Sequence, residues 1–122
     1  MTTTVLRLSA AIEVATGAAL IAVPGLVAHL LLGAGLSDAG IAVARLTGIA
    51  LLCLGLACWP GADHASNAAI RALFAYNLLA GIYLGYLRVG GGFVSYLLWP
   101  ACGLHLALGL LLARPASETF LE

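Results

Sequence analysis

Hydrophobic residues fall into four long runs, at 5–23, 39–58, 67–87 and 93–113, and short polar or glycine-rich segments separate them. A helix of about 20 residues spans the roughly 30 Å apolar interior of a bilayer. Because the intervening segments are short, neighbouring helices are expected to run in opposite directions. The pattern therefore predicts an all-α protein: one domain, built as an antiparallel four-helix transmembrane bundle in a lipid bilayer.

Prolines divide or end some of these runs. Pro24-Gly25 ends the first run, so 26–32 is expected to form either a kinked continuation or a separate interfacial helix. Trp99-Pro100 lies inside the fourth run and predicts a kink there. Arg114-Pro115 is expected to end the last helix.

The composition supports lipid as the solvent. Of the 122 residues, 63% are hydrophobic and only 8% are charged, the mean hydropathy is +1.11, and lysine is absent. A soluble domain carries about 25% charged residues, so this chain could not cover a water-facing surface. The formal net charge is zero and no basic run occurs, which argues against a nucleic-acid partner.

The few arginines indicate the orientation. In an antiparallel bundle Arg7, Arg71 and Arg114 lie on one side of the membrane, and Arg88 lies on the other. The side richer in arginine is normally the cytoplasmic one. Both termini are therefore expected in the cytoplasm.

One strongly polar side chain stands well inside each apolar run: Glu13, Arg45, Asn77 and His105. A rise of about 1.5 Å per residue places all four in the middle third of the bilayer. Each shares a helix face with small residues, where membrane helices pack together. Since a charge facing lipid costs at least about 2.5 kcal/mol, we expect the four to converge, with Glu13 and Arg45 forming an ion pair.

Three further residues are placed to support this cluster: Thr16, Tyr83 and Cys102. Tyr76 is an alternative to Tyr83, because the rotation of the third helix decides which hydroxyl reaches the cluster. The cluster has three interpretations: a structural ion pair surrounded by hydrogen bonds, a site for a ligand, proton or ion, and a contact with a partner subunit. We expect a neutral His105 that donates one hydrogen bond and accepts one.

The same residues give little support for a metal or a catalytic centre. A bis-histidine haem needs two histidines at matching depth, and only His105 lies deep. Cys102 and His105 could share a metal ion, but no third ligand accompanies them. No nucleophile, histidine and acid are placed together. No metal, cofactor or catalytic residue is therefore assigned, and an enzyme is the least favoured class.

The segment Ala11-Ile-Glu-Val-Ala-Thr-Gly17 resembles the first helix of small multidrug resistance transporters. In those transporters a glutamate of this helix binds protons and cationic drugs, so the resemblance implies such a role for Glu13. The aromatic-rich third span and the loop motifs of that family are missing, and Arg45 departs from a site that binds cations.

The first half of the chain resembles the DoxX-like set of small four-helix bacterial membrane proteins. Pro24 followed by Leu30-Leu-Leu-Gly33, then Ala44-Arg-Leu-Thr-Gly48 and Leu51-Leu-Cys-Leu-Gly55, carry this resemblance. It implies the four-helix fold and a bacterial cytoplasmic (inner) membrane. Members of the set are often subunits or helpers of other membrane systems.

These observations favour a small, non-enzymatic integral membrane protein. It would bind a small amphipathic ligand or lipid in its bundle, or serve as an accessory subunit, as a homodimer or with a partner membrane subunit. Two alternatives come from other classes. One is a small proton-coupled transporter in which Glu13 titrates, and the other is a membrane enzyme that uses His105 and Glu13 as an acid–base pair.

Overall fold

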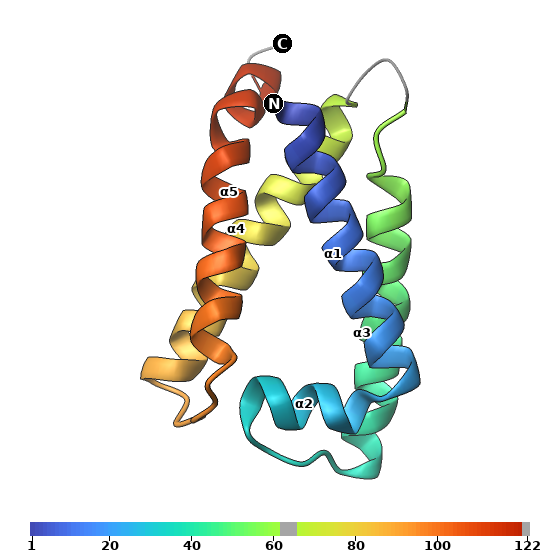
Figure 1. Cartoon of the computed structure of the whole chain (residues 1–122), viewed down its shortest axis with the longest axis vertical. Helices are drawn as coiled ribbons and strands as arrows, with labels where there is room; N and C mark the ends of the chain where they lie inside the picture. The colour runs from blue at the N-terminus through green and yellow to red at the C-terminus, as the bar shows by residue number, and fades with distance from the viewer. Residues whose placement is uncertain (62–65, 121–122) are drawn as a thin grey trace.

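The computed structural model describes residues 1–61 and 66–120, and all regular structure in these ranges is helical. Five helices occur there (Figure 1): α1 (Thr2–Ala22), α2 (Pro24–Leu32), α3 (Asp38–Ala57), α4 (Asn67–Val89) and α5 (Leu98–Phe120). All except α2 are long and apolar enough to cross a membrane. The prediction of an all-helical chain with four long apolar helices is therefore confirmed. The loop expected at 62–66 lies, apart from Ser66, outside the described residues.

The first apolar run forms two helices because a proline interrupts it. α1 ends at Ala22, Val23 donates its backbone N–H to Ala19 O at 2.8 Å, and Pro24 occupies the first turn of α2. Proline has no N–H, so it fits a first turn, where that group would have no helical partner. Of the two forms expected for 26–32, the separate helix is correct. In Figure 1, α2 lies across one end of the molecule, and Gly33, with φ 70°, ends it.

The prolines of the last helix behave differently from the prediction. α5 begins at Leu98, so Pro100 falls in its first turn, where its missing N–H needs no helical partner, and the predicted kink is wrong. α5 also continues through Pro115 to Phe120, which corrects the predicted end at Arg114-Pro115. Ala116 gives the reason for the extension: its side chain is 1% exposed and packs in the hydrophobic core.

Close contact at glycines joins the long helices into two pairs. Between α1 and α3, a Cβ atom added to Gly17 would lie 2.6 Å from Gly48 O. Between α4 and α5, a Cβ atom added to Gly81 would lie 2.6 Å from the side chain of Leu106. Glycine permits such approaches because it has no side chain. The contacts within the α1–α3 and α4–α5 pairs are much more extensive than those between the pairs.

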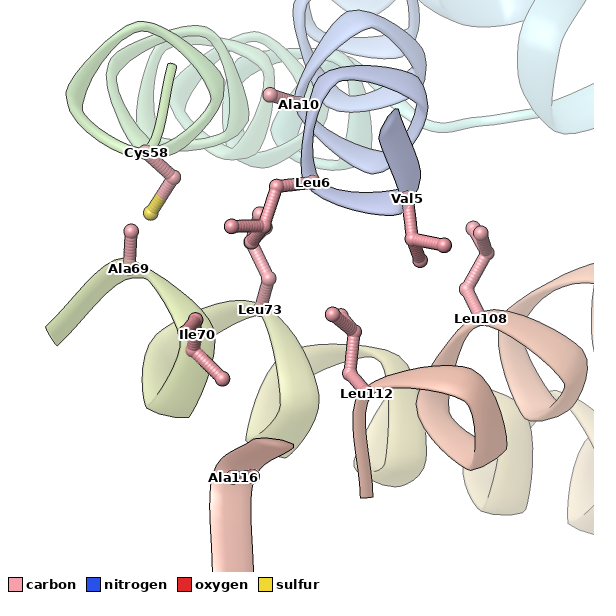
Figure 2. Packing of buried hydrophobic residues seen from close by; sticks show 10 residues of the cluster. All are labelled: Val5, Leu6, Ala10, Cys58, Ala69, Ile70, Leu73, Leu108, Leu112 and Ala116. Atoms are coloured by element: carbon pink, nitrogen blue, oxygen red, sulfur yellow. The ribbon is translucent and has the colours of Figure 1, made fainter. Parts of the chain in front are cut away.

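The two pairs meet at the end of the molecule that holds both chain termini, and they diverge toward α2 (Figure 1). The hydrophobic core lies where they meet, and Figure 2 shows its buried residues: Val5, Leu6, Ala10, Cys58, Ala69, Ile70, Leu73, Leu108, Leu112 and Ala116. Leu6, Leu73 and Leu112 have no exposed surface. The core thus holds the pairs together at one end, and the next helical turns carry the polar residues described below.

Candidate functional site

Asn77 connects three helices one turn beyond the core. Its side chain is fully buried, and Nδ2 donates to Ser9 Oγ on α1 and to Leu73 O on α4, both at 2.8 Å. Its Oδ1 lies 2.9 Å from His105 Nδ1 on α5. Both ends of the amide therefore have partners, which avoids the large cost of burying a polar group without a hydrogen bond.

Glu13 lies one turn farther along α1 than Ser9 and contacts a different residue. Its side chain is 1% exposed, and the Tyr76 hydroxyl of α4 donates a hydrogen bond to the carboxylate. The remaining carboxylate oxygen, Oε1, is buried and has no hydrogen-bond partner among the described residues. The Tyr76 and His105 rings meet edge to face, with centroids 5.7 Å apart and planes at 81°. We refer to these five residues, Ser9, Glu13, Tyr76, Asn77 and His105, as the polar cluster.

Arg45 does not belong to the polar cluster, and the expected ion pair with Glu13 is wrong. The Arg45 side chain is exposed, and no ion pair joins it to Glu13 in the part of the chain that the structure describes. Tyr76, a neutral residue, is the hydrogen-bond partner of Glu13 instead.

The register of α1 against α3 explains why Arg45 is absent. Gly17 lies against Gly48, and a Cβ atom on Gly55 would lie 2.6 Å from Ala10 O, so residue numbers fall along α1 as they rise along α3. Glu13 is four residues from Gly17, and Arg45 is three residues from Gly48 on the opposite side of that contact. Their levels therefore differ by seven residues, which is about 10 Å along the axes.

Of the two candidate tyrosines, Tyr76 reaches the polar cluster. Tyr83 is 59% exposed and stacks on Tyr86, with ring centroids 6.3 Å apart and planes at 25°. The rotation of α4 thus directs Tyr76 toward α1 and leaves Tyr83 outside the polar cluster.

Cys102 has a packing role in this structure. It is buried, and its thiol donates to Gly81 O on α4 at 3.2 Å. His105, three residues farther along α5, is bonded to Asn77. Across residues 1–61 and 66–120, no three His, Cys, Asp or Glu side chains come together in a way that could hold a metal ion.

A largely apolar cavity of about 270 Å³ lies between the helix pairs, next to the polar cluster. Its hydrophobic lining comes from α1, α2, α4, α5 and the segment before α5, and its two polar lining residues are Thr16 and His105. The volume is close to the lower end, about 300 Å³, of typical ligand pockets. The cavity therefore has room for a small apolar body with a polar end near Thr16 and His105.

Ser9 was not among the residues predicted for the site, and of the two tyrosines Tyr83 was placed in it, with Tyr76 as the alternative. Ser9 lies one turn before Glu13 on the same helix face, and this spacing is the feature of the sequence that could have assigned Ser9 to the site. Tyr76 precedes Asn77 directly, so the two side chains point to neighbouring faces of α4. Which of them faces α1 depends on the packing of α4 against α5.

No protein-family model, curated protein or solved structure matches this chain.

Proposed function

We propose that this chain is an integral protein of the bacterial cytoplasmic membrane. In this proposal its four long helices cross the bilayer in alternating directions, with both termini in the cytoplasm. The apolar character of these helices supports the membrane assignment, as do large exposed hydrophobic side chains such as Val43, Leu46 and Leu79. The arginine distribution supports the orientation, and the resemblance to DoxX-like proteins supports the bacterial membrane.

The function we propose is the non-enzymatic binding of a small amphipathic molecule, or one chain of a lipid, between the helix pairs. The observation that carries this proposal is the cavity, whose apolar lining ends at Thr16 and His105 beside the polar cluster.

The arrangement favours binding over acid–base catalysis by Glu13 and His105. Glu13 receives its hydrogen bond from Tyr76, and His105 Nδ1 bonds to Asn77. A catalytic pair would need both groups to reach the same substrate atoms. Glu13 and His105 instead bond to two different, adjacent residues of α4, which is the arrangement of side chains held in place within the polar cluster.

Photolabelling of the cavity tests the binding function. The protein in phosphatidylcholine nanodiscs is labelled with decanol that carries a diazirine on its alkyl chain, and the labelled peptides are mapped by mass spectrometry. Ala101 lines the cavity and Ala107 is exposed on the same helix. Ala101→Leu fills the cavity and should abolish saturable labelling, whereas Ala107→Leu should leave it unchanged. Labelling that does not saturate, or that is equal in both variants, would contradict the proposal.

One observation favours a second candidate function, proton-coupled transport through Glu13. This carboxyl group is buried and has no cationic partner among the described residues, so it is available to bind a proton or a cation. Reconstituted liposomes with a pH gradient test this function. Proton-dependent flux of a cationic dye that disappears in Glu13→Gln would support transport. An equal flux in wild type, in Glu13→Gln and in protein-free liposomes would rule it out.

A further inference from the structure

The hydrogen bonds of Asn77 determine which of its amide atoms faces His105. Nδ2 donates to Leu73 O at 2.8 Å and to Ser9 Oγ at 2.8 Å. A backbone carbonyl can only accept a hydrogen bond, so the group facing Leu73 O must be the NH₂ group. The atom that faces His105 at 2.9 Å is therefore the amide oxygen, Oδ1, which can only accept.

This arrangement fixes the tautomer of His105. Because Oδ1 is an acceptor, Nδ1 of His105 must carry the hydrogen. An apolar surrounding without a carboxylate partner favours the neutral imidazole, and in a neutral imidazole that carries its hydrogen on Nδ1 the second nitrogen, Nε2, holds a free lone pair. His105, which lines the cavity, therefore keeps one hydrogen-bond acceptor free.

Thr16 supplies the second polar group of the cavity. A threonine within a helix commonly donates its hydroxyl to the carbonyl four residues earlier, as Thr47 does to Val43 O at 2.9 Å. Thr16 makes no such bond, and its hydroxyl has no partner among the residues that the structure describes. The Thr16 hydroxyl is thus free to donate or to accept.

From these two groups we infer that the cavity takes the neutral hydroxyl end of a mainly apolar molecule, an alcohol or a phenol. This inference deepens the binding function proposed above and rests on it. A hydroxyl donates to Nε2 of His105 and accepts from the Thr16 hydroxyl, which matches both groups. An ether has no hydrogen for Nε2, an ammonium group brings a positive charge into a largely apolar lining, and a carboxylate has no hydrogen for Nε2 and adds negative charge close to Glu13.

Competition between probes that differ only at the head group tests this inference. The photoreactive decanol is bound to the protein in phosphatidylcholine nanodiscs and is displaced by decanol, decyl methyl ether, decylammonium or decanoate. Decanol should compete at least about tenfold better than the other three, since the ether and decanoate leave the bond to Nε2 unmade and decylammonium must bury its charge in the apolar cavity. Thr16→Val, which removes only the hydroxyl, should reduce the decanol preference, whereas Thr47→Val should not change it.

A direct signal accompanies the competition. Bound decanol should shift the ¹⁵N resonance of His105 Nε2 in the direction expected when the lone pair of this nitrogen accepts a hydrogen bond. Bound decyl methyl ether should not produce this shift. Saturable binding with equal or better competition by the ether or by decylammonium would overturn the hydroxyl preference while leaving the binding function intact. The absence of saturable binding for every probe would overturn the binding function and this inference with it.

Discussion

Within the part of the chain that the structure describes, the Glu13 carboxylate has one hydrogen bond, which the Tyr76 hydroxyl donates. The carboxylate is 1% exposed, so water cannot replace Tyr76 if that bond is lost. Removing one partner from a buried polar group exposes the full desolvation cost of the other, and that cost is larger for a charged group than for a neutral one. The stability of the polar cluster is therefore sensitive to the loss of the Tyr76 hydroxyl oxygen.

We predict that Tyr76→Phe lowers the free energy of unfolding by about 1–3 kcal/mol. Tyr83→Phe is the matched control, because Tyr83 lies on the same helix, is 59% exposed and stays outside the polar cluster. Unfolding by sodium dodecyl sulfate in mixed micelles, followed by circular dichroism, measures both variants. Equal losses for the two tyrosines would show that the bond to Glu13 contributes nothing specific.

We also predict that Glu13→Gln and Arg45→Gln act independently. Their levels differ by about 10 Å along the helices, and no ion pair joins the two residues in the described chain. The change in unfolding free energy of the double variant should equal the sum of the single changes within about 0.5 kcal/mol. The same unfolding assay measures all three variants. A loss in the double variant well below the sum of the single losses would show that Glu13 and Arg45 do form an ion pair.

At this scale the sequence predicts which residues are polar and deep, but it does not predict their partners. Asn77 and His105 were expected in one cluster because each lies on a face of small residues, and they share a hydrogen bond. Arg45 was placed by the same argument and is exposed. Neighbouring helix faces differ by only about 60–100° of rotation, and the register of two helices is set by contacts that no single helix reveals.

The α1–α3 pair is the element whose geometry depends most on small residues. Gly17 and Gly48 face each other so closely that each would place a Cβ atom within 2.7 Å of the other's carbonyl oxygen. Backbone atoms at this distance cannot move aside without separating the helices. The contact thus sets both the spacing and the register of the pair.

Gly48→Ala should therefore destabilise the protein by about 1–3 kcal/mol, the usual cost of overpacking. Gly103→Ala is the control, because a Cβ atom at Gly103 meets nothing within 4 Å. Alanine has the higher helix propensity, by roughly 1 kcal/mol, so this control should be neutral or stabilising. Thermal denaturation of both variants in one detergent measures the difference in stability. If Gly48→Ala is as stable as the wild type, α1 and α3 do not pack against each other at Gly48.

The elements themselves follow from the sequence more fully than the contacts do. Apolar runs of helical length predict the four long helices, and Pro24 predicts the break before α2, because both signals are local. The extension of α5 past Pro115 was not predictable in this way. It depends on the burial of Ala116 in a core that other helices supply.

For the whole molecule, the proposed orientation predicts which surfaces reagents reach from outside the cell. Tyr96 is 99% exposed before α5, and Glu118 is exposed near the C-terminus. In a Cys53→Ser background, Tyr96→Cys should react with a membrane-impermeant maleimide in intact spheroplasts, and Glu118→Cys should react only after permeabilisation. The reverse labelling pattern would show that the protein has the opposite orientation. Labelling of both sites in intact spheroplasts would show that both orientations occur.

The divergence of the two helix pairs gives the protein a different footprint in each leaflet of a bilayer. With α2 lying across the wide end (Figure 1), the leaflet around α2 must yield more area than the leaflet around the termini. A tapered inclusion deforms the lipids beside it, as a mismatch in hydrophobic length does, and the small deformation energies of such a mismatch sort proteins among membranes. The protein should therefore concentrate where the leaflet around α2 is stretched, on the convex side of curved membrane. Its enrichment on tubes drawn from giant vesicles, relative to the flat membrane, would measure how strongly membrane shape decides where the molecule resides.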